Sequence, residues 1–96
     1  MKPSIALDQK RNAVRGAASR FRAANPRVFG SVLHGVDRGG SDLDLLVDAL
    51  PGAILFDLGG LHVELEELLD VPVDLLTHGD LPPKFREQVL AEALPV

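Results

Sequence analysis

Two aspartates separated by one residue carry the clearest chemical signal in this chain. They are Asp42 and Asp44, and the apolar run Leu45–Val47 follows them. If Leu43–Val47 forms a strand, both carboxylates project from the same face, because side chains alternate with period 2 along a strand. Carboxylates held this close repel each other, and a divalent cation is the usual reason for keeping them together. The pair therefore indicates a metal site.

A third acid, Asp74, lies in an otherwise apolar stretch, Val71–Thr77, that we expect to form a strand. A charged side chain there is costly unless it is paired or bound to a metal. If this strand neighbours Leu43–Val47, three carboxylates converge. Two like charges about 4 Å apart repel by roughly 4 kcal/mol at an effective dielectric of about 20, and magnesium would relieve that repulsion.

Three acids around magnesium are suited to phosphoryl transfer, in which two ions stabilise the attacking and leaving oxygens. In such a site Asp74 would take a hydroxyl proton or orient the base that takes it. The alternative is that Asp74 lies on an edge strand and faces water, which Pro72 allows, because proline is confined to strand starts and edges.

A Gly-Ser pair, Gly30-Ser31, precedes the acids at an expected strand-to-helix junction. Glycine lets a phosphate approach the backbone closely, and the serine hydroxyl donates to a phosphate oxygen. Free N–H groups and the helix dipole would add positive potential there. Alone, such a dipeptide is a common loop sequence. Together with the carboxylates, it predicts that metal and phosphate are bound side by side.

Hydrophobic periodicity and breaker residues predict the elements that position these side chains. The first is a helix from Asp8, its expected N-cap, to about Ala24, ended by Asn25-Pro26. The later elements are the strand Arg27–Phe29, the short helix Val32–His34, the strand Leu43–Val47, the helix Phe56–Leu69, the strand Val71–Thr77 and the helix Lys84–Ala93. The order α-β-α-β-α-β-α predicts an α/β architecture in which helices cover a small sheet.

Length and composition bound the class of protein. Residues 1–96 are expected to form one domain, and the chain has no cysteine, so disulfide and thiolate chemistry are excluded. No apolar stretch approaches the roughly 20 residues of a membrane helix, and the N-terminus lacks the apolar core of a signal peptide. We therefore expect a soluble, cytoplasmic protein that does not bind membranes.

Positive charge is concentrated in the first third of the chain, whereas acids dominate the remainder. The expected first helix thus offers a candidate face for a protein partner, with Arg11, Arg15 and Arg22 its foremost residues. The alternative is an ordinary solvated helix face. Sequence-specific nucleic-acid binding is not expected, because the chain has no Tyr or Trp and only four Phe.

Gly30-Ser31, a spacer and Asp42-Leu43-Asp44 together resemble the nucleotidyltransferase motif of the DNA polymerase beta superfamily. That motif is Gly-Ser, about ten residues, two acids flanking one apolar residue, and a later acid on another strand. The string from Phe29 to Val47 is most similar to the minimal nucleotidyltransferases, the MntA-like antitoxins of HEPN–MNT toxin–antitoxin pairs. The resemblance extends over nearly the whole chain and implies the small mixed sheet of that fold.

The resemblance implies a magnesium-dependent enzyme, with two ions expected, that transfers AMP from ATP to a tyrosine of a partner HEPN RNase toxin and so neutralises it. By position, Gly30 and Ser31 would hold the triphosphate, and Ser41 would buttress the turn at this nucleotide site. The residues expected to bind the metals and to form the catalytic triad are Asp42, Asp44 and Asp74.

Two further readings stay open. The chain could be a non-catalytic antitoxin that inhibits its toxin by binding alone, or a small-molecule transferase that works with a helical partner subunit. Larger relatives add a substrate-binding domain, and we expect none in residues 1–96, which favours a protein substrate. His34 departs from the arginine of many relatives, so it would either weaken nucleotide binding or be an ordinary surface residue. His62 and His78 are expected to be structural or exposed, and Asp48 lies too far along its strand to join the acids.

Overall fold

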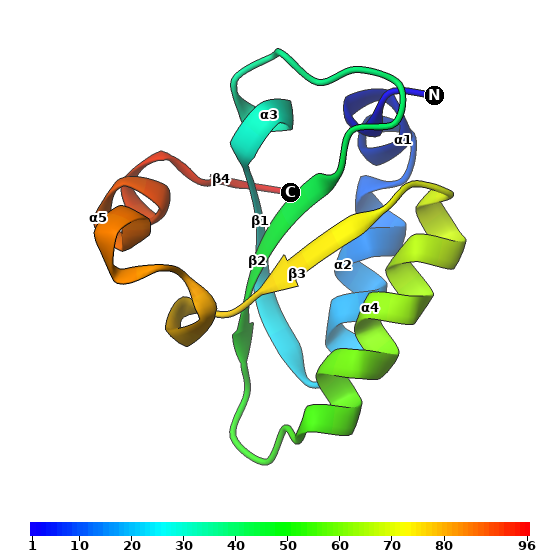
Figure 1. Ribbon diagram of the computed structural model, residues 1–96. Helices are drawn as coiled ribbons and strands as arrows, with labels where there is room; N and C mark the ends of the chain where they lie inside the picture. Colours follow the sequence, from blue (N-terminus) through cyan, green and yellow to red (C-terminus); the bar gives the residue numbers. More distant parts are fainter.

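A computed structural model describes residues 1–96 and shows a four-stranded mixed sheet with helices on both faces (Figure 1). The strand order is β3-β2-β1-β4. Strand β1 (Ala23–Phe29) is antiparallel to both β2 (Leu43–Ala49) and β4 (Leu94–Pro95), whereas β3 (Val73–Leu76) is parallel to β2. The predicted α/β class and mixed sheet are confirmed, although the two-residue strand β4 was not expected.

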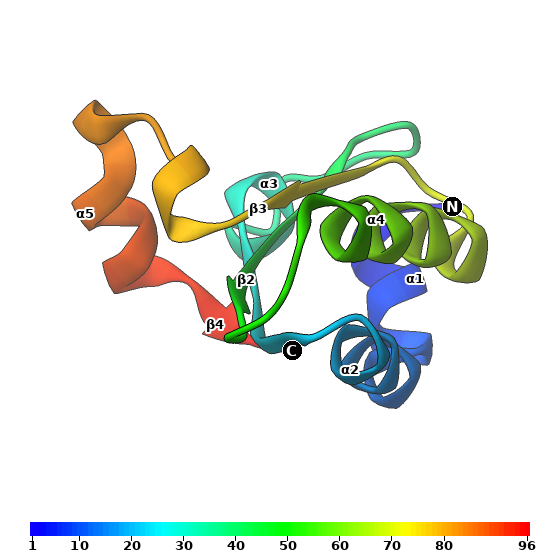
Figure 2. The same cartoon turned by 90° about the horizontal axis from the view of Figure 1, so that it is seen from below.

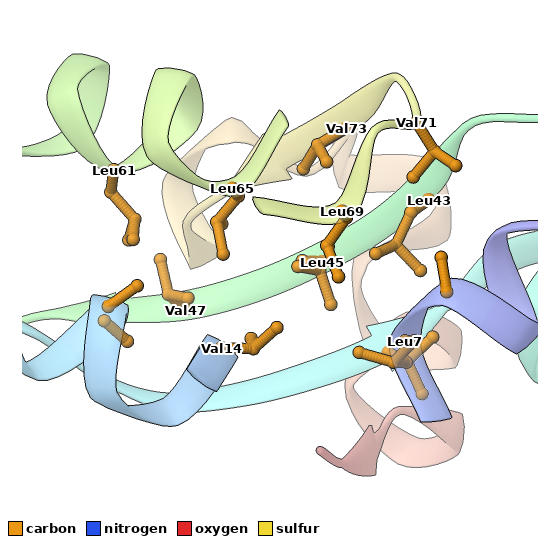
Figure 3. Close-up of a cluster of buried hydrophobic side chains, with 14 of the residues drawn as sticks. Leu7, Val14, Leu43, Leu45, Val47, Leu61, Leu65, Leu69, Val71 and Val73 are labelled. Atoms are coloured by element: carbon orange, nitrogen blue, oxygen red, sulfur yellow. The ribbon is translucent and has the colours of Figure 1, made fainter. Parts of the chain in front are cut away.

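The main core lies between the sheet and the helices α2 (Arg11–Arg20) and α4 (Leu55–Leu69) (Figure 3). Alternation along β2 builds it, since Leu43, Leu45 and Val47 are almost fully buried on the helix side. The intervening side chains of β2 consequently project from the opposite face, and Asp44 is among them. Burial of the odd-numbered residues therefore fixes the direction in which the even-numbered acids point.

The predicted helix Asp8–Ala24 is wrong in its boundaries. The structure has two helices, α1 (Pro3–Gln9) and α2, which are separated at Lys10, where φ is −136°. Asp8 lies within α1 and bonds Arg11 at 2.8 Å, so it is not the expected N-cap. No glycine or proline marks the break at Lys10, which is why helical periodicity alone bridged it.

Strand β1 begins four residues earlier than expected, because Asn25-Pro26 lies inside a strand instead of ending a helix. The β1–β2 register shifts between Ala24 and Arg27, and Asn25 has a φ of +52°. Such a bulge accommodates proline, which has no N–H to give to the sheet. The breaker residues were recognised correctly, but they interrupt a different element.

The second half of the chain follows the prediction more closely. The expected helix Phe56–Leu69 is α4, which Asp57 caps by accepting a 2.9 Å hydrogen bond from the Ile54 N–H. After β3 come a short 3₁₀ turn, η1 (His78–Asp80), and the helix α5 (Pro83–Glu92). Figure 2 shows α5 on the sheet face opposite α1, α2 and α4. The longest helix, α4, has 15 residues, and none of the helices could span a membrane.

Candidate functional site

Asp44 and Asp74 are direct neighbours on adjacent parallel strands. The β2–β3 register pairs Asp44 with Asp74, one residue after Leu43 is paired with Val73. Neighbouring strands lie about 4.7–4.9 Å apart, so the two carboxyls project from one face at close range. Asp42, just before β2, lies on the same side by the period of the strand. The structure thus brings the three predicted acids together on the sheet face away from the main core.

Electrostatics confirm that these acids influence one another. Partial burial, repulsion from Asp74 and Asp42, and a hydrogen bond with the Asp74 carboxyl together raise the pKa of Asp44 from 3.8 to about 6. Asp42 and Asp74 are exposed to solvent, whereas Asp44 is half-buried between them. The cluster is therefore open to a ligand, and any positive charge that entered it would favour the ionised form of Asp44.

The donors of this cluster fit magnesium bound together with a nucleotide. No three acidic, histidine or cysteine side chains are arranged to hold a metal ion unaided. Magnesium is ordinarily bound by one or two carboxylates plus substrate phosphates, not by an all-protein cage. Asp42, Asp44 and Asp74 supply hard oxygen donors of this kind. Because these carboxylates repel one another, a bound cation would lower the electrostatic energy of the cluster.

Gly30 lies against the acid cluster, where α3 (Gly30–Leu33) follows β1. Its φ is +73°, and a β-carbon built on it would overlap the Oδ2 atom of Asp44. Glycine is therefore needed at this position to accommodate the carboxylate. Because α3 has only four residues, its dipole is small, and phosphate binding here would depend on the Ser31 hydroxyl and local N–H groups.

The loop between α3 and β2 is held at two points. The Ser41 hydroxyl accepts a 2.9 Å hydrogen bond from the Arg38 N–H, which fixes the turn before β2. Asp37, a residue only 7% exposed, accepts through its carboxylate a 2.9 Å hydrogen bond from the Ser4 N–H in the first turn of α1. That bond lowers the pKa of Asp37. Ser41 thus holds the turn, and its assignment to nucleotide binding stays a prediction.

Sequence reasoning missed Asp37, because nothing local distinguishes it from other loop aspartates. Asp48 was correctly left out of the cluster, since it accepts hydrogen bonds from Arg27 at 2.6 Å and Asn25 at 3.0 Å. His62 is structural, because its Nε2 lies 2.7 Å from the Val73 carbonyl oxygen. Asp48 and His62 therefore lie outside the cluster formed by Asp42, Asp44 and Asp74.

The arginines of the first helices are largely occupied within the chain. Arg11 bonds Asp8, Arg20 bonds Glu64 at 3.0 Å, and Arg15 donates to the Val96 carbonyl oxygen at 2.7 Å. Arg22, in the turn after α2, donates to the Gly52 carbonyl oxygen at 3.2 Å. These contacts favour the alternative of an ordinary surface over a basic docking face.

Comparison with known families agrees with this geometry. Residues 11–96 match the family described as "Nucleotidyltransferase domain". The chain therefore belongs to the nucleotidyltransferase domain family and is a nucleotidyltransferase.

Individual relatives narrow the similarity further. The chain is 39% identical over 69 residues, 72% of its length and 74% of the relative, to "Putative protein adenylyltransferase MJ0435" of Methanocaldococcus jannaschii. A solved "putative minimal nucleotidyltransferase" is 45% identical with a TM-score of 0.86, covering 97% of this chain and 95% of that one. The expected likeness to minimal nucleotidyltransferases is thereby confirmed.

A more distant solved structure has the same fold. It is described as a "toxin-antitoxin with AMP-PNP" and has a TM-score of 0.72 at 22% identity, covering 88% of this chain and 69% of that chain. At this level of identity the likeness concerns the fold alone.

Proposed function

We propose that this protein is a magnesium-dependent protein adenylyltransferase that moves AMP from ATP to a tyrosine of a partner HEPN-type toxin and thereby neutralises it. The observation that carries the proposal is the pairing of Asp44 with Asp74 beside Gly30. A relative 39% identical to this chain is named as a protein adenylyltransferase, and a structure of the same fold is described as a toxin–antitoxin with AMP-PNP. Both names support the proposal.

In the proposed reaction, the tyrosyl oxygen forms a bond to the α-phosphorus of ATP, and the bond from that phosphorus to the β-phosphate oxygen breaks. Pyrophosphate leaves, and the hydroxyl proton passes to a carboxylate. Magnesium, when bound by Asp42, Asp44 and Asp74, supplies positive charge next to the phosphates. Asp74 is exposed beside Asp44, so it is placed to receive the proton directly or through water.

The protein's own groups have distinct tasks in this scheme. The Ser31 hydroxyl donates to a phosphate oxygen, and Gly30 leaves room for the Asp44 carboxylate. The elevated pKa of Asp44, about 6, means that the free cluster binds a proton as the pH falls through about 6. Binding of the cation and nucleotide would release that proton, so nucleotide affinity should increase as the pH rises through 6.

Exposure of the acids favours a macromolecular acceptor. Asp42 and Asp74 are exposed to solvent on the sheet face opposite α1, α2 and α4, the face on which α5 lies (Figure 2). A partner protein would supply the rest of the acceptor site. The alternative, an antitoxin that acts by binding alone, is supported by two exposed apolar residues. Leu55 is 85% exposed and Phe56 is 86% exposed. Such a patch is typical of interaction surfaces.

One experiment separates catalysis from binding. The protein is incubated with α-labelled ATP, magnesium and the HEPN-type partner, and label on the partner is measured. We expect transfer by the wild type, none by Asp42→Asn/Asp44→Asn, and normal transfer by Asp48→Asn, whose acid bonds Arg27 away from the cluster. If no label transfers and the double variant still silences the partner, the protein acts by binding alone.

A further inference from the structure

A small pocket opens between α3 and α5, directly beside Gly30. Its volume is about 240 Å³, and its lining includes Phe29, Gly30 and His34 on one side and Phe85, Gln88 and Glu92 on the other. Whole small-molecule ligands occupy pockets of about 300–1,000 Å³, so this one suits a fragment of a ligand. We propose that it is the nucleobase subsite and that Gln88 selects adenine by its 6-amino group; this inference rests on the proposed function.

The position of the pocket follows from Gly30. This residue lines the pocket and also lies against the Asp44 carboxylate. A nucleotide whose phosphates lie at the acids therefore has its other end within reach of the pocket. Figure 1 shows α3 and α5 coming from distant parts of the sequence, before β2 and after β3. Gly30 thus lies between the part of the site that would hold the phosphates and the part that would hold the base.

Aromatic rings give the pocket its affinity for a planar ligand. Phe85 is 51% exposed, an unusual position for a phenylalanine, and Phe29 lines the opposite side. Lys84 lies 5.6 Å from the centre of the Phe85 ring. An exposed ring at a pocket that Phe29 and Val89 also line offers a stacking surface, and every base has a face that can stack on it.

The polar side chains decide which base is accepted. The Glu92 carboxylate accepts from the Gln88 Nε2 at 3.3 Å and lies 3.2 Å from the His34 Nε2. Because a carboxylate at neutral pH only accepts hydrogen bonds, it orients the amide NH₂ of Gln88 toward itself. The carbonyl oxygen of Gln88 then remains as an acceptor for the ligand. It favours the 6-amino group of adenine over the 6-oxo group of hypoxanthine or guanine.

The test measures binding, not transfer. The protein is titrated calorimetrically with ATP, ITP and inorganic tripolyphosphate in the presence of magnesium. ITP differs from ATP in carrying a 6-oxo group, and tripolyphosphate has no base. We expect ATP to bind about tenfold more tightly than ITP, which is the scale of a single base-specific hydrogen-bond contact. Tripolyphosphate should bind more weakly than either nucleotide.

Two pocket variants and one control locate the effect. Gln88→Leu should bring ATP and ITP to within about twofold of each other, and Phe85→Ala should weaken both nucleotides about tenfold. Neither variant should alter tripolyphosphate binding. Val63→Ala, on an exposed position of α4 across the sheet, should change none of the three. Both pocket residues are exposed, so their replacement should leave the fold intact.

Other outcomes would overturn the inference. Equal binding of ATP and ITP by the wild type, or an ATP preference that persists in Gln88→Leu, would show that the pocket does not select the base. The transfer assay with labelled ATP would still decide the proposed function in that case. A wild-type protein that bound none of the three ligands would contradict the nucleobase subsite and the proposed function together.

Discussion

The backbone of Gly30 and the carboxylate of Asp44 occupy adjoining space: a β-carbon at Gly30 would overlap the Asp44 Oδ2 and lie 2.9 Å from its Cγ. The positive φ of Gly30, +73°, adds a second reason for glycine at this position. The glycine of the Gly-Ser pair thus makes room for the central acid of the site. Glycine is therefore required here by the packing of the Asp44 carboxylate, independently of any contact with phosphate.

Replacing Gly30 by alanine should therefore disable the site. We expect Gly30→Ala to displace the Asp44 carboxylate and to lower kcat/KM for AMP transfer about 100-fold, the scale of a misplacement of roughly 1 Å. The strained backbone should also cost about 1–3 kcal/mol of stability, measurable by urea unfolding. Gly39→Ala is the matched control, because nothing lies within 4 Å of its β-carbon position and its φ is not positive. Full activity in Gly30→Ala would contradict the packing argument.

Neutralising Asp44 should stabilise the ligand-free protein while abolishing transfer. The rise of its pKa from 3.8 to about 6 corresponds to about 3 kcal/mol, which solvent screening of this half-buried carboxyl reduces to about 1 kcal/mol. Asp44→Asn should therefore raise the Tm by about 4–8 °C at pH 7 in the absence of magnesium. Asp48→Asn should lower the Tm, since it breaks the pair with Arg27.

The pH dependence of this effect has a defined sign. The folded-state pKa of Asp44 lies above its ordinary value of 3.8, so the fold holds this proton more tightly than the unfolded chain does. The contribution of Asp44 to stability is fully present below pH 3.8 and is lost as the pH rises through about 6. The Tm difference between Asp44→Asn and the wild type should accordingly vanish near pH 4. A difference that stayed constant from pH 4 to 8 would show that Asp44 is not the titrating group.

Removing Asp37 should loosen the loop that leads into β2. Asp37→Ala leaves the Ser4 N–H at the start of α1 without its acceptor, so we expect a lower Tm at neutral pH. Because that bond lowers the folded-state pKa of Asp37, its contribution is present above the ordinary pKa of 3.8 and is lost as the pH falls through the folded-state value. Thermal unfolding at pH 7 and pH 3 checks this. Asp8→Ala, which loses only an exposed pair with Arg11, should have a smaller effect.

Strand β3 forms one edge of the sheet, and α4 covers part of it. The Val73 N–H donates to Glu66 at 2.9 Å, and the Val73 carbonyl oxygen lies 2.7 Å from the His62 Nε2. Uncovered edges pair with other chains. His62→Ala/Glu66→Ala should therefore increase self-association at high concentration, measured by light scattering. Glu67→Ala, exposed on the same helix, should remain as monodisperse as the wild type.

Local signals in the sequence determined several parts of this protein. Period-2 alternation in Leu43–Val47 is enough to place Asp42 and Asp44 on one face, because strand geometry requires it. Helical periodicity likewise predicted α4 to within one residue at its start. These features depend on neighbours in sequence, whose geometry the backbone fixes. The break at Lys10 and the two-residue strand β4 carry no such local signal, and both were missed.

Only the tertiary structure decided how the site is assembled. The register of Asp44 with Asp74 depends on the pairing of two strands joined through α4, and no local pattern specifies that pairing. The same holds for Gly30 against Asp44 and for the Ser4 N–H on Asp37, each a contact between distant segments. Burial of one sheet face under α2 and α4 selects these contacts, because it fixes which side chains are left on the other face. The sequence by itself therefore determined which residues carry the chemistry, and packing of the core determined that they meet.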